Sequence, residues 1–223
     1  IEDKHIDQAL DFVVKLQELD PPDFFQVASE ACTSADQLFS QIEDRLQQFE
    51  ILEDNHLRQF LQKVFKPLYQ DVRKWSERHW PSNNLQDELP KTNQTLSPSD
   101  FGFHNALRRP NGEIAFLDFE YFGWDDPAKM ISDFLLHPAS QLDDELKHRF
   151  ARNIIAGFED NPNLASRVEA VYPLFGLKWC LIILNEFLPG FIERRRDAGE
   201  GTAYDPRTFL AEQLMKARRY CER

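Results

Sequence analysis

The dipeptide Asn111-Gly112 is the feature that most constrains the fold of this chain. It separates two short strand-like runs, Asn105–Arg109 and Ile114–Phe119, and Asn-Gly between such runs is typical of a tight β-hairpin. The sequence therefore predicts one antiparallel hairpin near the middle of the chain.

The hairpin predicts which polar side chains meet. With Asn111-Gly112 as a two-residue loop, Asn105 lies directly opposite Asp118, and a single bulge would shift this register by one residue. Facing side chains are about 5 Å apart at Cβ, which is close enough to share one ion. Asp100 precedes the first strand by a short loop. We therefore expect Asp100, Asn105 and Asp118 to converge.

The rest of the chain has helical patterns, so the expected fold class is α+β and predominantly α. From Ile1 to Trp80, apolar residues recur at spacings of three and four, Ser34 with Gln37 matches a capping box, and Pro67 is expected to kink its helix. Asp126-Pro127 predicts the start of a helix that reaches about His137. Further helices are expected over Asp143–Phe158, Asn163–Leu188 and Asp205–Cys221.

The three converging residues suit a magnesium–phosphate site. Mg²⁺ prefers a few hard oxygen ligands and keeps several waters, so Asn105 and Asp118 are candidate ligands for the metal of a bound nucleotide. Asp100, beside the metal, is the candidate catalytic residue that orients a substrate hydroxyl. The alternative is turn chemistry, because Asp and Asn also accept backbone hydrogen bonds in loops.

Four nearby residues are candidates for contact with substrate or for support of the site: His104, Glu120, Asp126 and Asp133. Each has a structural alternative. His104 could instead be a loop or core histidine, and Glu120 a surface carboxylate. Asp126 could cap a helix, and Asp133 could lie on the polar face of a helix. Arg194–Arg196 could bind a phosphate-bearing substrate or form a solvated turn.

Composition limits the partners. The net charge is −12, from 26 basic and 38 acidic residues, which disfavours a nucleic-acid partner and suits a cationic substrate or simple solubility. The three cysteines have no metal-site spacing, which fits a reducing compartment. The apolar stretch Leu174–Leu188 is interrupted by polar residues, so we expect no membrane span and a cytoplasmic protein.

Two segments carry a family resemblance: SDFGFHNAL and GEIAFLDFEYFGWDDPAKMISDF resemble the aminoglycoside phosphotransferase and choline kinase family, relatives of the protein kinases. Pro173–Pro189 is similar to the C-terminal helices of that family. The resemblance implies that residues 1–223 are a single protein-kinase-like C-terminal lobe that uses Mg²⁺ and ATP. It also implies that Asp100 is the catalytic aspartate, Asn105 a magnesium ligand, and Asp118 the counterpart of the aspartate that opens the DFG segment.

The chain departs from the family pattern in two ways. Pro98 stands where the family usually has a histidine, two residues before the catalytic aspartate. No glycine-rich loop precedes Asp100, since Gly102 is the first glycine, and no strand upstream carries a lysine of the kind that pairs with ATP phosphates. We therefore expect the N-terminal nucleotide lobe to be absent from this chain.

The leading expectation is an ATP-dependent phosphotransferase that acts on a hydroxyl of a small molecule, of the amino sugar, amino alcohol or sugar type. The alternative is a non-catalytic kinase-like lobe that binds a ligand or partner, which Pro98 and the missing nucleotide lobe favour. A hydrolase is disfavoured because the motif region has no nucleophile–base pair. The sequence specifies neither the acceptor nor the oligomeric state.

Overall fold

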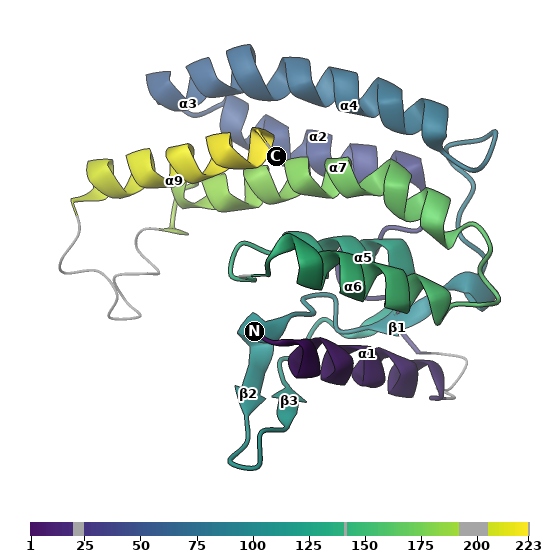
Figure 1. Cartoon of the computed structure of the whole chain (residues 1–223). Coiled ribbons are helices and arrows are strands. Elements are labelled where there is room, and N and C mark those ends of the chain that lie inside the picture. The colour runs from purple at the N-terminus through teal and green to yellow at the C-terminus, as the bar shows by residue number, and fades with distance from the viewer. Residues whose placement is uncertain (20–24, 141, 192–204, 223) are drawn as a thin grey trace. The chain divides into compact units, whose positions relative to one another are not determined.

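The computed structural model describes residues 1–19, 25–140, 142–191 and 205–222, which form two compact units. The first unit contains Ile1–Gln37 and His79–Tyr172, and the second contains Leu38–Arg78 and Pro173–Arg223. Figure 1 labels their elements. Arg194–Arg196 lies outside the described residues.

In its described residues, the first unit combines the helices α1, α5 and α6 and the first half of α7 (Leu164–Ile183) with two small antiparallel sheets. Strand β1 pairs with β4, and strand β2 pairs with β3. The elements are α1 (Asp3–Gln17), η2 (Lys91–Asn93), β1 (Thr95–Ser97), η3 (Phe103–Asn105), β2 (Ala106–Arg108), β3 (Ile114–Phe116), β4 (Gly123–Asp125), α5 (Pro127–Leu136) and α6 (Asp144–Ala156). The predicted α+β, predominantly α class is confirmed.

The second unit is helical in its described residues. Its elements are most of α2 (Ala35–Glu50), α3 (Asn55–Phe60), the π-helical turn η1 (Leu61–Phe65), α4 (Lys66–His79), the second half of α7 (Leu164–Ile183), η4 (Leu184–Phe187) and α9 (Pro206–Cys221). The π turn lies just before Pro67, whose ring and missing N–H are incompatible with a regular α-helical turn.

Side-chain caps begin the helices as the sequence predicts. Asp126, Asp143 and Asp205 each accept a hydrogen bond from a backbone N–H in the first turn that follows, at 2.8, 2.9 and 3.1 Å. At α2, Ser34 Oγ accepts from the Gln37 N–H, whereas the Gln37 side chain accepts from the N–H of Thr33 and not of Ser34. Only the Ser34 half of the predicted capping box therefore forms as expected, and the Gln37 side chain bonds the residue before Ser34.

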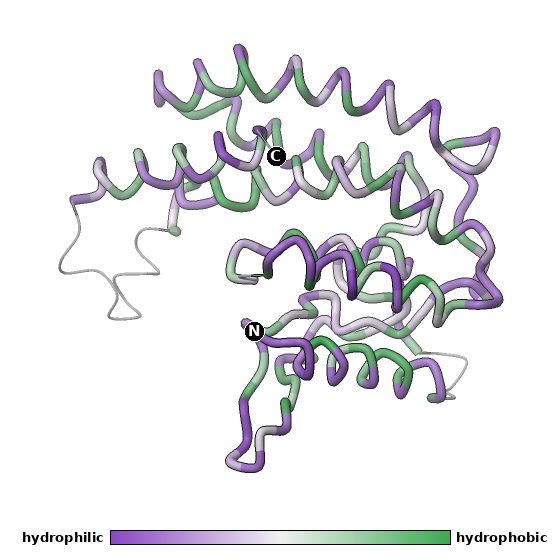
Figure 2. The backbone as a smooth tube through the Cα atoms, in the orientation of Figure 1, coloured by the Kyte–Doolittle hydropathy of each residue, from purple (hydrophilic) through white to green (hydrophobic). Residues whose placement is uncertain are grey.

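Apolar residues line the buried faces of the helices in each unit, as the alternation of colours along the tube in Figure 2 shows. Leu164–Phe187 is the one described helix that is long and apolar enough to cross a membrane. However, 61% of its most apolar window is buried inside the protein, which is the environment of a core helix.

The predicted hairpin forms, but its register is wrong by one residue. Ala106 pairs with Phe116, and the Arg109 N–H bonds the Glu113 carbonyl at 2.8 Å. The loop therefore has three residues, because Gly112 adopts a left-handed φ of 87° and its N–H bonds the Arg109 carbonyl at 2.9 Å.

This shift changes the partner of Asn105. Its carbonyl accepts from the Leu117 N–H at 2.8 Å, so Leu117, and not Asp118, lies opposite it. Strand β3 ends at Phe116, which leaves both Asp118 and Glu120 outside the ladder. The expectation that Asn105 directly faces Asp118 is corrected accordingly.

The second unit also brings two cysteines together. Cys180 on α7 and Cys221 at the end of α9 are free thiols with their sulfur atoms 3.6 Å apart, and Cys180 is fully buried. The pKa of the Cys221 thiol is lowered by its hydrogen bond with Cys180 and by nearby Arg218, whereas burial raises the pKa of Cys180.

We expect the oxidant diamide to join Cys180 to Cys221. The two thiols would lose two hydrogens to diamide, and a disulfide needs only a short approach of sulfur atoms already in contact. Peptide mass spectrometry after a denaturing alkylation step should find this link in the wild type and in Cys32→Ser, and not in Cys221→Ser. A link that involves Cys32 would contradict the geometry.

Candidate active site

The turn that carries Asp100 has an unusual backbone. β1 ends at Ser97, and the Asp100 N–H bonds the Pro98 carbonyl at 2.9 Å. Ser99, at the centre of this three-residue turn, has a φ of 67°. Such conformations cost about 1–3 kcal/mol in non-glycine residues and cluster at functional sites, so the strain itself marks the position before Asp100.

Two phenylalanines anchor the segment that follows. Phe101 stacks on Phe134 of α5 with ring centroids 4.9 Å apart, and Phe103 meets the edge of the same ring at 5.4 Å. Their burial fixes the path of the backbone on which Asp100, His104 and Asn105 lie. These aromatic rings account for the alternation of polar and aromatic residues in SDFGFHN.

The Asp100 carboxylate is held at both oxygens. His104 Nε2 lies 3.0 Å from Oδ1, and Asn105 Nδ2 donates to Oδ2 at 3.1 Å and to the Asp100 carbonyl at 3.0 Å. Burial acts to raise the pKa of Asp100, but the hydrogen bonds and the two nearby imidazoles hold it below its ordinary value. The carboxylate is therefore ionised at neutral pH, and its side chain remains 40% exposed.

His137 joins this site, although no sequence pattern singles it out. It ends helix α5, and its ring stacks on His104 with centroids 3.5 Å apart and planes 4° from parallel. Its Nε2 lies 3.8 Å from Asp100 Oδ1. The sequence contains one indication of its importance, because His137 lies at the predicted end of the helix that Asp126-Pro127 begins.

The two candidate metal ligands, Asn105 and Asp118, each keep an oxygen atom to which no described group donates. Since both Asp100 oxygens are acceptors, the amide nitrogen of Asn105 must face them, and its Oδ1 makes no hydrogen bond within the described residues. Asp118 is exposed with a φ of 63°, and no described side chain or backbone group bonds its carboxylate. Two hard oxygen donors of this kind fit a Mg²⁺ ion that completes its shell with water and phosphate, and their role as metal ligands remains a prediction.

Ligand atoms of Asp100, His104 and His137 also lie within 4.8 Å of one another. The two rings cannot bind the same ion together in this arrangement, because a metal binds an imidazole nitrogen in the plane of its ring at about 2.1 Å. Parallel planes 3.5 Å apart leave no point that satisfies both. The two histidines are better suited to hold the carboxylate than to hold a metal.

Asp133 supports the site from α5. Its carboxylate and that of Asp125 each lie 3.1 Å from the buried Lys129 ammonium, which also donates to Ser99 Oγ at 3.4 Å. Burial alone would lower the pKa of Lys129, but the two carboxylates hold it above its ordinary value. Asp133 thus reaches the strained residue before Asp100 through a charged lysine.

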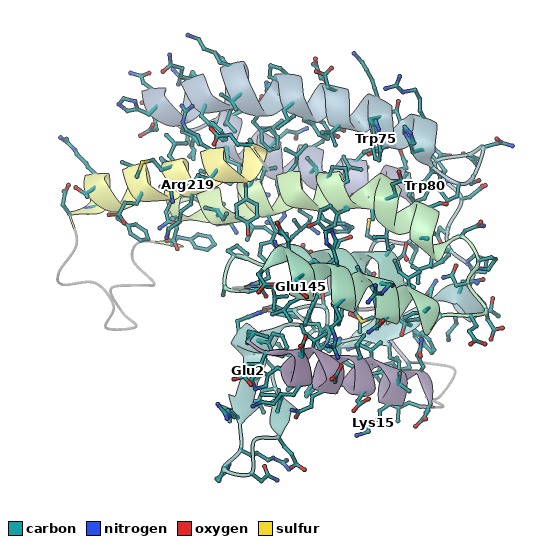
Figure 3. The ribbon with its side chains drawn as sticks, viewed as in Figure 1. Glu2, Lys15, Trp75, Trp80, Glu145 and Arg219 are labelled. Atoms are coloured by element: carbon teal, nitrogen blue, oxygen red, sulfur yellow. The ribbon has the colours of Figure 1, made fainter. Side chains whose placement is uncertain are left out.

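Asp126 has a structural role, as its sequence context favours. It caps α5 and forms a buried ion pair with Arg167, whose Nε lies 3.0 Å from Oδ2. The Arg167 guanidinium also covers the ring of Trp80, which Figure 3 labels, at 4.5 Å from the ring centroid. These partners leave Asp126 no free oxygen for a substrate.

Glu120 lies in the exposed turn after β3. Its carboxylate accepts a hydrogen bond from the Tyr121 hydroxyl, which raises the pKa of that phenol. The negative charges of Asp118 and Asp100 raise the same pKa further. The acidic groups therefore share one electrostatic environment near Tyr121. No observation brings Glu120 into contact with the predicted metal ligands.

The fold has clear counterparts among solved structures. A choline/ethanolamine kinase family protein from Mesorhizobium loti matches 99% of this chain with a TM-score of 0.57 and 17% identity. An ethanolamine kinase from Plasmodium vivax matches 97% with a TM-score of 0.55 and 13% identity, and a choline kinase from Cryptosporidium parvum matches 97% with a TM-score of 0.50 and 12% identity.

The chain has a protein-kinase-like fold. It spans 62%, 59% and 65% of those three solved chains, in the same order. No protein-family model and no curated protein sequence matches it. The kinase-like fold confirms what the resemblance of SDFGFHNAL implies for the architecture, and the roles of individual residues remain predictions.

We expect His137 to make folding of this kinase-like chain pH-dependent. Burial and the neighbouring His104 lower the pKa of His137 from 6.5 to about 4, so the unfolded chain gains a proton at a higher pH than the folded one. The free energy of unfolding should therefore be highest above about pH 6.5 and fall as the pH decreases toward about 4.

Chemical denaturation at a series of pH values measures this effect. His137→Gln should show a weaker loss of stability over that range than the wild type, and His148→Gln, at an exposed position on α6, should keep the wild-type dependence. Equal pH dependence in all three proteins would show that His137 is not the responsible group.

Proposed function

We propose that this chain is the catalytic and substrate-binding lobe of an ATP-dependent phosphotransferase that acts on a hydroxyl of a small molecule. The main support is the state of Asp100, an ionised carboxylate held at both oxygens and still 40% exposed. A carboxylate fixed in this way can accept the hydrogen of an approaching hydroxyl without prior rearrangement.

In the proposed reaction, Asp100 accepts a hydrogen bond from the acceptor hydroxyl and orients its oxygen toward the γ-phosphorus of ATP. The new oxygen–phosphorus bond forms as the bond to the bridging oxygen of ADP breaks, and the hydroxyl proton passes to Asp100. Asn105 Oδ1 and the Asp118 carboxylate would hold Mg²⁺, which supplies positive charge against the phosphates when bound.

The surface next to the metal ligands suits a nucleotide base. Leu107, Leu117 and Phe119 belong to the hairpin and the turn after it, and their side chains are 60%, 44% and 43% exposed. Apolar side chains beside a phosphate site can contact a purine ring, as is common in cofactor sites. A nucleotide-binding lobe in the remainder of a longer protein would supply the opposite wall.

An amine-bearing acceptor fits the charge of the site. Asp100, Asp118 and Glu120 are all acidic, and the chain carries a net charge of −12. Amino alcohols and amino sugars are therefore favoured over neutral sugars. The names of the solved neighbours, choline and ethanolamine kinases, agree with an amino alcohol.

The second candidate is a non-catalytic binding lobe. Pro98 in place of the usual family histidine favours it. The support that His104 and Asn105 give to Asp100 disfavours it, because a lobe that only binds a ligand has no need of a fixed, ionised and exposed carboxylate.

We expect Asp100→Asn to lower phosphoryl transfer by about 10²- to 10⁴-fold, the range typical for loss of a general base. The assay measures ADP release by the complete protein as its gene encodes it, with Mg²⁺-ATP and a panel of amino alcohols, amino sugars and sugars. Asp144→Asn is the matched control, since that side chain is 91% exposed on α6.

Two results would contradict the proposed function. One is an Asp100→Asn protein that is folded and turns over near the wild-type rate. The other is a wild-type protein that binds one of the acceptors and transfers no phosphate to it, which would favour the binding lobe.

A further inference from the structure

We propose that His104 and His137 act together as a positioning pair for the Asp100 carboxylate. This inference rests on the proposed phosphotransferase function for its catalytic meaning, but its geometry concerns the protein alone. Neither histidine occupies position 98, where this chain has Pro98 and the family usually has a histidine, so the support of the Asp100 carboxylate comes from other elements in this chain.

The two histidines near Asp100 Oδ1 come from different elements of the chain. His104 lies four residues after Asp100 in the turn η3, with Nε2 3.0 Å from Oδ1, and His137 lies at the end of α5, with Nε2 3.8 Å from it. The rings are in face-to-face contact at 3.5 Å. The stack therefore couples the position of the catalytic turn to that of a buried helix.

The hydrogen bonds define the tautomers. His137 Nδ1 accepts the Ala139 N–H at 3.1 Å, so a neutral His137 carries its hydrogen on Nε2. His104 donates from Nε2 to the ionised carboxylate, which leaves its Nδ1 as a bare acceptor. His104 thus presents its Nε2–H to Asp100 Oδ1, and Asn105 donates to Oδ2. His137 Nε2, 3.8 Å from Oδ1, is beyond hydrogen-bond distance, so His137 contributes by holding the His104 ring in the stack.

A neutral donor suits a carboxylate that must stay reactive. His104 Nδ1 is buried without a hydrogen-bond partner, so a second proton there would be a buried N–H with no acceptor, which is costly. A neutral imidazole fixes the carboxylate without the full positive charge of a lysine or arginine. Asp100 therefore keeps its negative charge for the acceptor hydroxyl.

Gly102 gives His104 the room to occupy this place. A Cβ at position 102 would lie 2.6 Å from His104 Nδ1 and 2.7 Å from its Cε1. Those distances are too short for non-bonded atoms, so any side chain at position 102 must displace the ring. Gly102→Ala is thus a way to disturb the stack without removing either histidine.

The first test is kinetic, on the complete protein with the acceptor that it phosphorylates. His104→Leu and Gly102→Ala should lower kcat by about 10- to 100-fold, as expected for misplacement of a catalytic group, with the KM for ATP within about twofold of the wild type. His104→Gln, whose amide can still donate to Asp100, should recover much of kcat. His148→Leu, at an exposed position on α6, is the matched control.

Two kinetic results would contradict positioning of Asp100 by the two histidines. If His104→Leu behaves like His148→Leu in a protein that transfers phosphate, positioning by the pair is wrong and the proposed function stands. If His104→Leu and His104→Gln lose kcat equally, together with thermal stability, the histidine is a structural residue only.

The second test needs no activity. Long-range ¹H–¹⁵N NMR of histidine-labelled protein should show the Nε2–H tautomer for both His104 and His137 in the wild type, and Gly102→Ala should shift both sets of ring signals. An Nδ1–H tautomer at His104, or ring signals unchanged by Gly102→Ala, would overturn the inference. This measurement decides the positioning role even if no acceptor is phosphorylated and the proposed function fails.

Discussion

A buried ammonium group holds the first unit of this protein together around its candidate site. Lys129 is 2% exposed and lies 3.1 Å from both Asp125, at the end of β4, and Asp133, one turn further along α5. Removing one partner from such a pair typically costs about 3–5 kcal/mol, because it leaves an uncompensated buried charge. The charge of Lys129 therefore fixes α5 against the strand and the turn on which the candidate catalytic residues depend.

Three contacts of α5 extend this constraint to Asp100. Lys129 donates to Ser99, whose left-handed conformation sets the direction of the next residue, while Phe101 packs on Phe134 of the same helix. The stack between His104 and His137 joins the other side of the turn to the end of α5. One helix thus holds the turn that carries Asp100 through a hydrogen bond, an aromatic contact and an imidazole stack. This is the preorganisation that the proposed phosphoryl transfer would require.

Local patterns predicted the elements well and the pairing less well. The Asp-Pro caps of α5 and α9 and the helical stripes were recognised because each depends on residues a few positions apart. The hairpin register was missed by one residue because Gly112 adopts a left-handed conformation in a three-residue loop, which Asn111-Gly112 alone does not specify. The sheet of β1 with β4 joins strands of three residues, too short for any alternation to appear. His137 was missed for a related reason, since its contact with Asp100 spans a whole helix.

Whether Asn105 and Asp118 hold the catalytic metal is tested most directly by titration of ¹⁵N-labelled protein with Mn²⁺, a paramagnetic substitute for Mg²⁺. Signal broadening should begin at the backbone amides of Asn105, Leu117 and Asp118, and Asp118→Ala should abolish this pattern. Broadening that begins at His104 and His137, or that spreads evenly over the acidic surface, would contradict a kinase-like metal site at the end of the hairpin.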